Sequence, residues 1–287
     1  MLIRNPVGWG ADQFRHWMDE VGEAVAAIHR PEEALRGPKP HVGQIGFSDL
    51  TWALRRGFED FMAFRTDVIM LCALYPMIGL LLAYLVVGHG LFEMLFPIAS
   101  GFALIGPFVA LGLYEMSRQR ELGKSVSWSS AFAVLQSRSA SGIAVLGFVL
   151  LAIFLAWLYA AQQIYDSTLG PGHPASVGQF LHDVFLTGPG WSLIVAGVGI
   201  GFLFALAVFM ISAVSFPLLL DRDDVGVDVA VGTSIRTVLR NPRTMAAWGL
   251  IVAGGLLLGS IPFFVGLAVV IPILGHATWH LYRRVAS

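Results

Sequence analysis

Long apolar runs alternate with short polar segments along most of the chain. Crossing about 30 Å of hydrocarbon takes roughly 20 mostly apolar residues in a helix. Six runs have this character: Val68–Val87, Leu95–Tyr114, Gly142–Ala161, Trp191–Val214, Met245–Ile261 and Phe263–Trp279. The last two are short and are separated only near Pro262, which favours a tight hairpin over one long kinked helix. The pattern predicts an all-α, polytopic membrane protein with six transmembrane helices in three helical hairpins.

A second pattern, with apolar residues at three- and four-residue steps, precedes each odd-numbered run. The first such segment places an apolar side opposite Arg55, Arg56, Glu59 and Asp60. Its apolar residues are Phe47, Leu50, Leu54, Phe58 and Phe61. The second runs from Trp128 to Gln136, and the third from about Val229 to Arg240, where Asn241-Pro242 ends it. These segments are predicted to be amphipathic helices in the headgroup layer, apolar side down.

Constant offsets between these segments indicate an internal duplication. A shift of 104 residues aligns Arg118 with Arg222, and a shift of 165 aligns Pro107 with Pro272 and Arg118 with Arg283. We infer three copies of the unit "interfacial helix, span, span", at about residues 47–118, 126–222 and 229–284. Together they form a predicted six-helix transmembrane domain over residues 41–287.

Residues 1–40 fall outside this unit. Residues 11–29 predict another amphipathic helix, with Asp12 as its cap, and a Pro/Gly-rich linker follows at 31–41. We weigh two roles for this helix: a membrane-surface anchor, or a docking helix for a partner protein. The first ten residues do not have the apolar core of a signal peptide.

Composition and charge support the membrane interpretation and orient the chain. Of 287 residues, 56% are hydrophobic and 13% charged, whereas soluble proteins average about 25% charged. All 18 Lys and Arg residues lie before the first run, between even- and odd-numbered runs, or after the last. Basic residues near spans stay on the cytoplasmic side, so we expect both termini in the cytoplasm and the protein in the bacterial inner membrane. The net charge of −1 gives no attraction for nucleic acid.

Candidate chemistry lies at the ends of the runs, because no Asp, Glu, Lys or Arg falls near the middle of any of them. This counts against ion-coupled transport. His276 and His280 are spaced i, i+4 and share one helix face, so they would bind a haem or a metal if further ligands came from elsewhere. The alternative is an aromatic belt with Trp279. Glu115 aligns with His280 under the 165-residue shift, which makes the two a candidate polar site at the cytoplasmic end.

Small residues predict close helix packing. Gly197 and Gly201 form one Gly-x-x-x-Gly motif, and Gly255 and Gly259 form another. Both motifs suit packing inside the bundle or contact with a second copy. The sequence contains no Gly-x-Ser-x-Gly elbow and no phosphate-binding loop between a strand and a helix, so no catalytic residue is assigned.

Several motifs resemble one bacterial family, that of predicted integral membrane proteins of unknown function. They include Ile45-Gly-Phe-Ser-Asp-Leu50, Leu74-Tyr-Pro-Met-Ile-Gly79, Gly112-Leu-Tyr-Glu-Met-Ser-Arg118 and Gly275-His-Ala-Thr-Trp-His-Leu-Tyr282. The resemblance covers roughly residues 40–285. Some members of that family are labelled putative cytochrome c oxidase subunit. An oxidase catalytic subunit needs several histidines within its spans, and this sequence has only His276 and His280 near one end.

These observations favour a non-enzymatic accessory, assembly or scaffold component, associated with the lipid bilayer and with a membrane protein complex or a second copy, near the respiratory chain. No cofactor is needed for this role. One alternative is a transporter or channel for a small neutral or lipid-like solute, which internal repeats and proline-bent helices suit. The other is a haem- or metal-binding protein that uses His276 and His280.

Overall fold

The computed structural model describes residues 40–286, except 73, 105, 128–129, 132, 135–136, 138 and 263. This part of the chain is helical and contains no strand, only an isolated bridge between Val42 and Ala286. The predicted all-α class is therefore confirmed. The helix expected at 11–29 lies outside the described residues, as do most of the linker at 31–41 and half of the helix expected at Trp128–Gln136.

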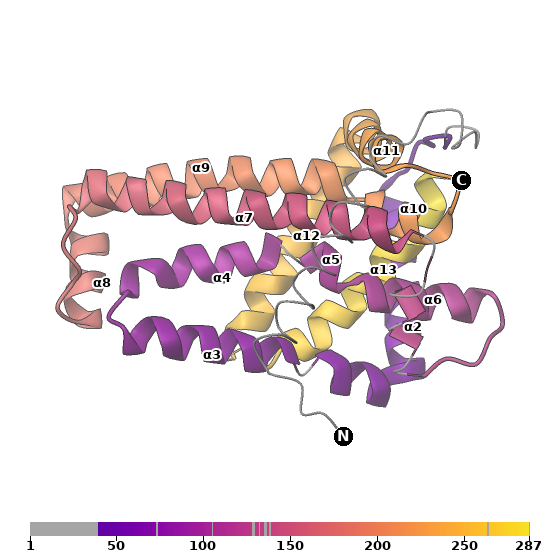
Figure 1. Cartoon of the computed structure of the whole chain (residues 1–287), viewed down its shortest axis with the longest axis horizontal. Coiled ribbons are helices and arrows are strands. Elements are labelled where there is room, and N and C mark those ends of the chain that lie inside the picture. Colours follow the sequence, from indigo (N-terminus) through magenta and orange to yellow (C-terminus); the bar gives the residue numbers. More distant parts are fainter. Residues whose placement is uncertain are drawn as a thin grey trace, which may run out of the picture.

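The two longest apolar helices lie side by side and run in opposite directions (Figure 1). They are α7, Ala140–Thr168, and α9, Gly188–Ser212. The short helix α8, Val177–Leu186, joins their far ends. At the corner, the Thr187 hydroxyl accepts a hydrogen bond from the Gly190 amide at 3.1 Å, and any side chain at Gly190 would overlap the carbonyls of α8. This corner fixes α7 and α9 as a hairpin.

The first third of the chain forms a second hairpin (Figure 1). Helix α2, Phe47–Cys72, bends at Phe64 and leads into α3, Leu74–Gly88. After the 3-10 turn η2, Phe92–Met94, the chain returns through α4, α5 and α6. These three helices comprise Leu95–Leu104, Gly106–Val109 and Leu111–Glu121. Within the expected second span, Ala110 forms a turn between α5 and α6, and residue 105 between α4 and α5 lies outside the described residues.

The last third of the chain places a helix in the centre of the molecule. After α10, Ser215–Asp221, follow α11, Val227–Arg240, and α12, Pro242–Ser260. Helix α11 ends at Asn241-Pro242, as the sequence predicts. The final helix α13, Leu267–Val285, packs along α2 and against α6. A side chain at Gly57 of α2 would lie 2.6 Å from the backbone of α13, so glycine permits this close approach.

The two ends of the bundle differ in chemistry (Figure 1). At one end lie the start of α2, the end of α6, helices α10 and α11, and the end of α13. We call this the polar end because arginine, aspartate and glutamate side chains gather there. The far end carries η2 and α8. The two ends are separated by helices whose outer side chains, such as Leu155, Val195 and Leu250, are exposed and apolar.

Among the described residues, three helices are long and apolar enough to cross a membrane. They comprise Ala140–Thr168, Gly188–Asp221 and Pro242–Ser260. The apolar helix Pro76–Gly88 is shorter. Large apolar side chains on the surface of a helix are stable in lipid and costly in water. The protein is therefore a helical bundle suited to a bilayer, with a polar cap of shorter helices at one end.

Candidate functional site

A buried polar cluster lies at the polar end, where α2, α6 and α13 meet. Its central residue is Asp60 of α2, whose side chain is buried. The sequence pattern placed Asp60 on the outward side of α2 with Glu59, and for Asp60 this expectation is wrong. The close contact at Gly57 turns that face of α2 toward α13, and Phe47 and Phe58 face outward instead.

Asp60 joins side chains from two other helices. Its Oδ2 accepts hydrogen bonds from the Ser117 hydroxyl at 2.6 Å and from His280 Nε2 at 2.8 Å, and its Oδ1 pairs with Arg120. The same Ser117 hydroxyl lies 2.8 Å from Nδ1 of His276. Because the serine proton points to Asp60, His276 Nδ1 must donate to Ser117, which leaves Nε2 of His276 unprotonated. That Nε2 is buried and has no hydrogen-bond partner.

His280 lies between two carboxylates. Its Nε2 faces Asp60, and its Nδ1 is 3.5 Å from Glu121 of α6. Burial lowers the pKa of His280, but the hydrogen bonds and charges of Asp60 and Glu121 outweigh it and raise that pKa above its ordinary value. Burial raises the pKa of Asp60, because it disfavours the charged carboxylate. The hydrogen bonds from His280 and Ser117 outweigh this effect, so the pKa of Asp60 lies below its ordinary value. The two groups therefore hold each other in their charged forms.

The ionic contacts continue from this cluster to α10. Glu121 Oε2 pairs with Arg283 at 3.3 Å, and Arg283 pairs in turn with Asp221 at 3.0 Å. Asp221 also lies 3.7 Å from Arg118 and accepts a hydrogen bond from Tyr282 at 2.8 Å. We call the whole set the buried network after its buried centre, although Arg120, Glu121 and Arg283 reach the surface. It comprises Asp60, Glu115, Ser117, Arg118, Arg120, Glu121, Asp221, His276, His280, Tyr282 and Arg283.

Glu115 and His280, the predicted polar site, both belong to this network. Glu115 pairs with Arg118 at 3.3 Å and accepts a hydrogen bond from Gln119 at 2.8 Å. Within the described part of the chain no hydrogen bond or ion pair joins the two residues directly; the path between them runs through Arg118, Asp221, Arg283 and Glu121. The sequence did not single out Ser117, Glu121 or Asp221. Ser117, Arg120 and Glu121 do share one face of α6, at steps of three and four residues, and this was the available signal.

The surroundings of the two histidines bear on the haem or metal hypothesis. Both nitrogens of His280 face carboxylates, and His276 Nδ1 is engaged by Ser117, so only His276 Nε2 has a free lone pair. Trp52 covers the His280 ring edge-on, with ring centroids 5.8 Å apart. Over the described residues, no group of three or more His, Cys, Asp or Glu side chains is arranged to hold a metal ion. These contacts count against a haem bound by both histidines. The broader hypothesis of a haem or metal site stays a prediction.

The four predicted packing glycines lie in different surroundings. Gly255 and Gly259 of α12 face α13, where a side chain at Gly259 would meet Leu267 at 2.9 Å. Gly201 of α9 faces the ring of Trp157 in α7, 3.0 Å from where its Cβ would stand. Gly197 has open space beside it and, with Gly201, lines an apolar groove of about 240 Å³.

The fold and the buried network define an all-helical integral membrane protein with an ion-paired cap at one end. Residues 95–221, from α4 to α10, match the family described as predicted integral membrane protein (DUF2189). This is the family of unknown function that the sequence motifs indicated, so the resemblance is confirmed over these residues. No curated protein matches the chain, and no solved structure does.

Proposed function

We propose that this protein is a non-enzymatic accessory, assembly or scaffold component of the bacterial inner membrane, near the respiratory chain. The observation that carries the proposal is the closed state of the buried network. Both oxygens of each of its four carboxylates face partner side chains of the protein itself. A carboxylate that binds a substrate or moves a proton needs an open side. A network without one is suited to hold helices in place.

The proposal includes six spans with both termini in the cytoplasm. Helices α3, α4, α7 and α9 run along one direction between the two ends of the bundle, and α12 and α13 cross them obliquely (Figure 1). The far-end segments 89–94 and 169–187 contain no Lys or Arg, nor does the α12–α13 connection at 261–266, whereas arginines gather at the polar end. This distribution supports a cytoplasmic polar end, since basic residues near spans are retained inside.

The apolar groove between α4, α7 and α9 supports contact with another membrane helix. Its lining includes Phe96, Trp157, Gly197 and Gly201, and its surface is almost wholly apolar. Small residues on an exposed helix let a second backbone come close, which is the main source of helix association in lipid. The helix that fills the groove would come from a partner complex or from a second copy of this chain.

The test is purification from native membranes after mild cross-linking, with mass spectrometry of the bound proteins and an optical spectrum of the eluate. We expect a reproducible membrane-protein partner or a homodimer, reduced severalfold by Gly197→Leu, which fills the groove. Gly254→Leu is the matched control, because a side chain there also meets open space but on α12.

Three results would contradict the proposal. A chain that is monomeric and alone after cross-linking would refute an accessory role. A Soret band that disappears in His276→Ala would support the haem hypothesis instead. Solute uptake by proteoliposomes that depends on this protein would support the transporter hypothesis.

A further inference from the structure

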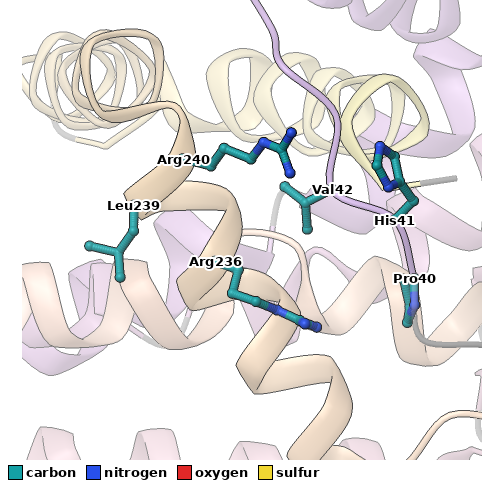
Figure 2. A pocket seen from close by; sticks show the side chains of 6 residues that line it. All are labelled: Pro40, His41, Val42, Arg236, Leu239 and Arg240. Carbon is teal, nitrogen blue, oxygen red and sulfur yellow. The ribbon is translucent and has the colours of Figure 1, made fainter.

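A basic hollow of about 480 Å³ lies beside α11 at the polar end, outside the buried network. It is lined by Pro40, His41 and Val42 on one side and by Arg236, Leu239 and Arg240 of α11 on the other. Figure 2 shows both arginines extending from α11 toward the segment at 40–42, while Leu239 points away from it. We call this feature the basic hollow.

The wall opposite α11 is held in place by hydrogen bonds. Asn241, at the end of α11, donates to the Gly43 carbonyl at 3.1 Å and accepts from the Ile45 amide at 2.9 Å. The Gly43 amide also donates to the Val285 carbonyl at 2.7 Å. Both sides of the hollow are thus fixed by contacts that do not involve the arginines. A ligand would find the hollow already formed, which reduces the entropy lost on binding.

The two arginines differ from those of the buried network, because no carboxylate of residues 40–286, as far as the structure describes them, pairs with either. Arg236 donates only to the Gly232 carbonyl at 3.2 Å and to the Thr233 hydroxyl at 3.1 Å. No carboxylate of the described residues pairs with Arg236 or Arg240, and none lines the hollow. By contrast, Arg118, Arg120 and Arg283 all have carboxylate partners. Among the described residues, the positive charge of the hollow is therefore uncompensated, which suits the hollow to an anion.

The position of α11 indicates which anion would reach it. Helix α11 packs on α9, α10 and α12 and runs across the end of the bundle, nearly along the line of sight of Figure 1. Leu239 lies between the arginines in sequence, and its side chain is 65% exposed. An interfacial helix with an exposed leucine and two arginines brings apolar and cationic groups to the depth of lipid phosphates. Arginine recognises phosphate through paired N–H donors.

We propose that the basic hollow binds the phosphate group of an anionic phospholipid from the cytoplasmic leaflet. Arg236 and Arg240 supply the charge and the hydrogen bonds, Asn241 positions the opposite wall, and Leu239 lies among the acyl chains. The inference rests on the cytoplasmic orientation proposed above for the polar end. It does not depend on an accessory role, since binding to lipid is measured on the purified protein alone.

The test is native mass spectrometry of the full chain in a neutral detergent, titrated with phosphatidylglycerol or phosphatidylcholine. We expect one tight phosphatidylglycerol site, and no equivalent site for phosphatidylcholine. Each arginine near a membrane surface contributes about fivefold in affinity for anionic lipid. The Arg236→Gln/Arg240→Gln variant should therefore bind about 25-fold more weakly. The matched control is Arg55→Gln/Arg56→Gln, which removes the same charge from exposed positions of α2 that pair with Glu59.

A second variant tests whether the shape of the hollow contributes to lipid binding in addition to the charge of the two arginines. Asn241→Ala keeps both arginines and releases the wall at Gly43 and Ile45, so it should also weaken binding severalfold. Equal loss in the control variant, or no loss in the Arg236→Gln/Arg240→Gln variant, would overturn the proposal. Competition by millimolar inorganic phosphate that matches phosphatidylglycerol would assign the hollow to free phosphate and refute the lipid. If cross-linking finds no protein partner but the lipid still binds, only the proposed accessory function is refuted.

Discussion

Asp60 is the residue through which three helices are joined. Its two oxygens contact Ser117 and Arg120 of α6 and His280 of α13, while its own backbone belongs to α2. Such a group stabilises the fold only as long as its partners are present, because a buried charge left unpaired costs several kcal/mol. The network is therefore most sensitive at this one carboxylate.

Asp60→Asn should destabilise the protein by about 3 kcal/mol, because the change removes the counterion of Arg120 and one of the two carboxylates beside the buried His280. The measurement is the denaturant midpoint in detergent micelles. Glu59→Gln is the neighbouring control. It removes a carboxylate that pairs only with the exposed Arg55 and Arg56, so it should leave the midpoint unchanged. Equal effects of the two substitutions would show that Asp60 is not special.

The pH dependence of stability should carry the signature of His280. Its pKa is raised above the ordinary 6.5, so its contribution is complete below pH 6.5 and is lost as the pH rises through the raised value. The contribution of Asp60, whose pKa lies below the ordinary 3.8, is present above pH 3.8 and is lost as the pH falls through the lowered value.

The midpoint of unfolding should therefore fall above pH 6.5 in the wild type. His280→Gln should remove that fall, and His89→Gln, at an exposed residue near the far end, should keep it. The same alkaline slope in all three proteins would rule out His280 as its origin.

At the scale of elements, the contact between α2 and α13 depends on a missing side chain. A Cβ at Gly57 would stand 2.6 Å from both the Ala277 nitrogen and the Ile273 carbonyl oxygen of α13. These are backbone atoms, so they can move away only if the whole helix moves. Separation of α2 from α13 would expose Asp60 and loosen the network.

Gly57→Ala should accordingly destabilise the protein by about 2 kcal/mol, as overpacking of a core does. Gly232→Ala is the matched substitution in α11, where a Cβ meets nothing within 4 Å. It should stabilise the protein by about 0.5–1 kcal/mol, since alanine favours helix more than glycine does. The two changes in the unfolding midpoint should have opposite signs, and a shared sign would contradict the close contact.

The helices were largely predictable from the sequence, and the contacts between them were not. Apolar runs and the Asn241-Pro242 stop located α9, α11 and the start of α7 within a few residues, because length and periodicity are local properties, whereas α7 continues to Thr168, beyond the predicted end at Ala161. The burial of Asp60 depends on which face of α2 meets α13, a contact between residues 220 positions apart in the chain. Hydropathy also did not indicate the turn at Ala110 within the second span. Among the described residues, three helices meet the length and composition expected of a span, and six spans stay a prediction.

At the scale of the whole molecule, the question is which end of the bundle lies on which side of the membrane. Both ends of the bundle carry exposed positions that a reagent can reach, Lys124 near the polar end and Ala175 in the far-end loop before α8. Cys72 is the only cysteine, so its replacement gives a clean background for labelling.

In a Cys72→Ala background, Ala175→Cys should react with a membrane-impermeant thiol reagent that is added to cells with an intact inner membrane. Lys124→Cys should react only after the membrane is opened. Labelling of Lys124→Cys from outside would contradict the proposed six-span topology and the proposed cytoplasmic position of the buried network.

The pairing of α2 with α13 has a consequence for synthesis. The ribosome makes Asp60 early, yet its partner His280 follows 220 residues later. At about 5–20 residues per second, this interval lasts roughly 10–45 s. During that time the acidic face of α2 has neither histidine beside it, so a nascent chain that stalls before α13 leaves an unpaired carboxylate at the membrane surface. Helix α13 is thus the element that completes this cluster, and every helix described before it must be held in the membrane without that contact.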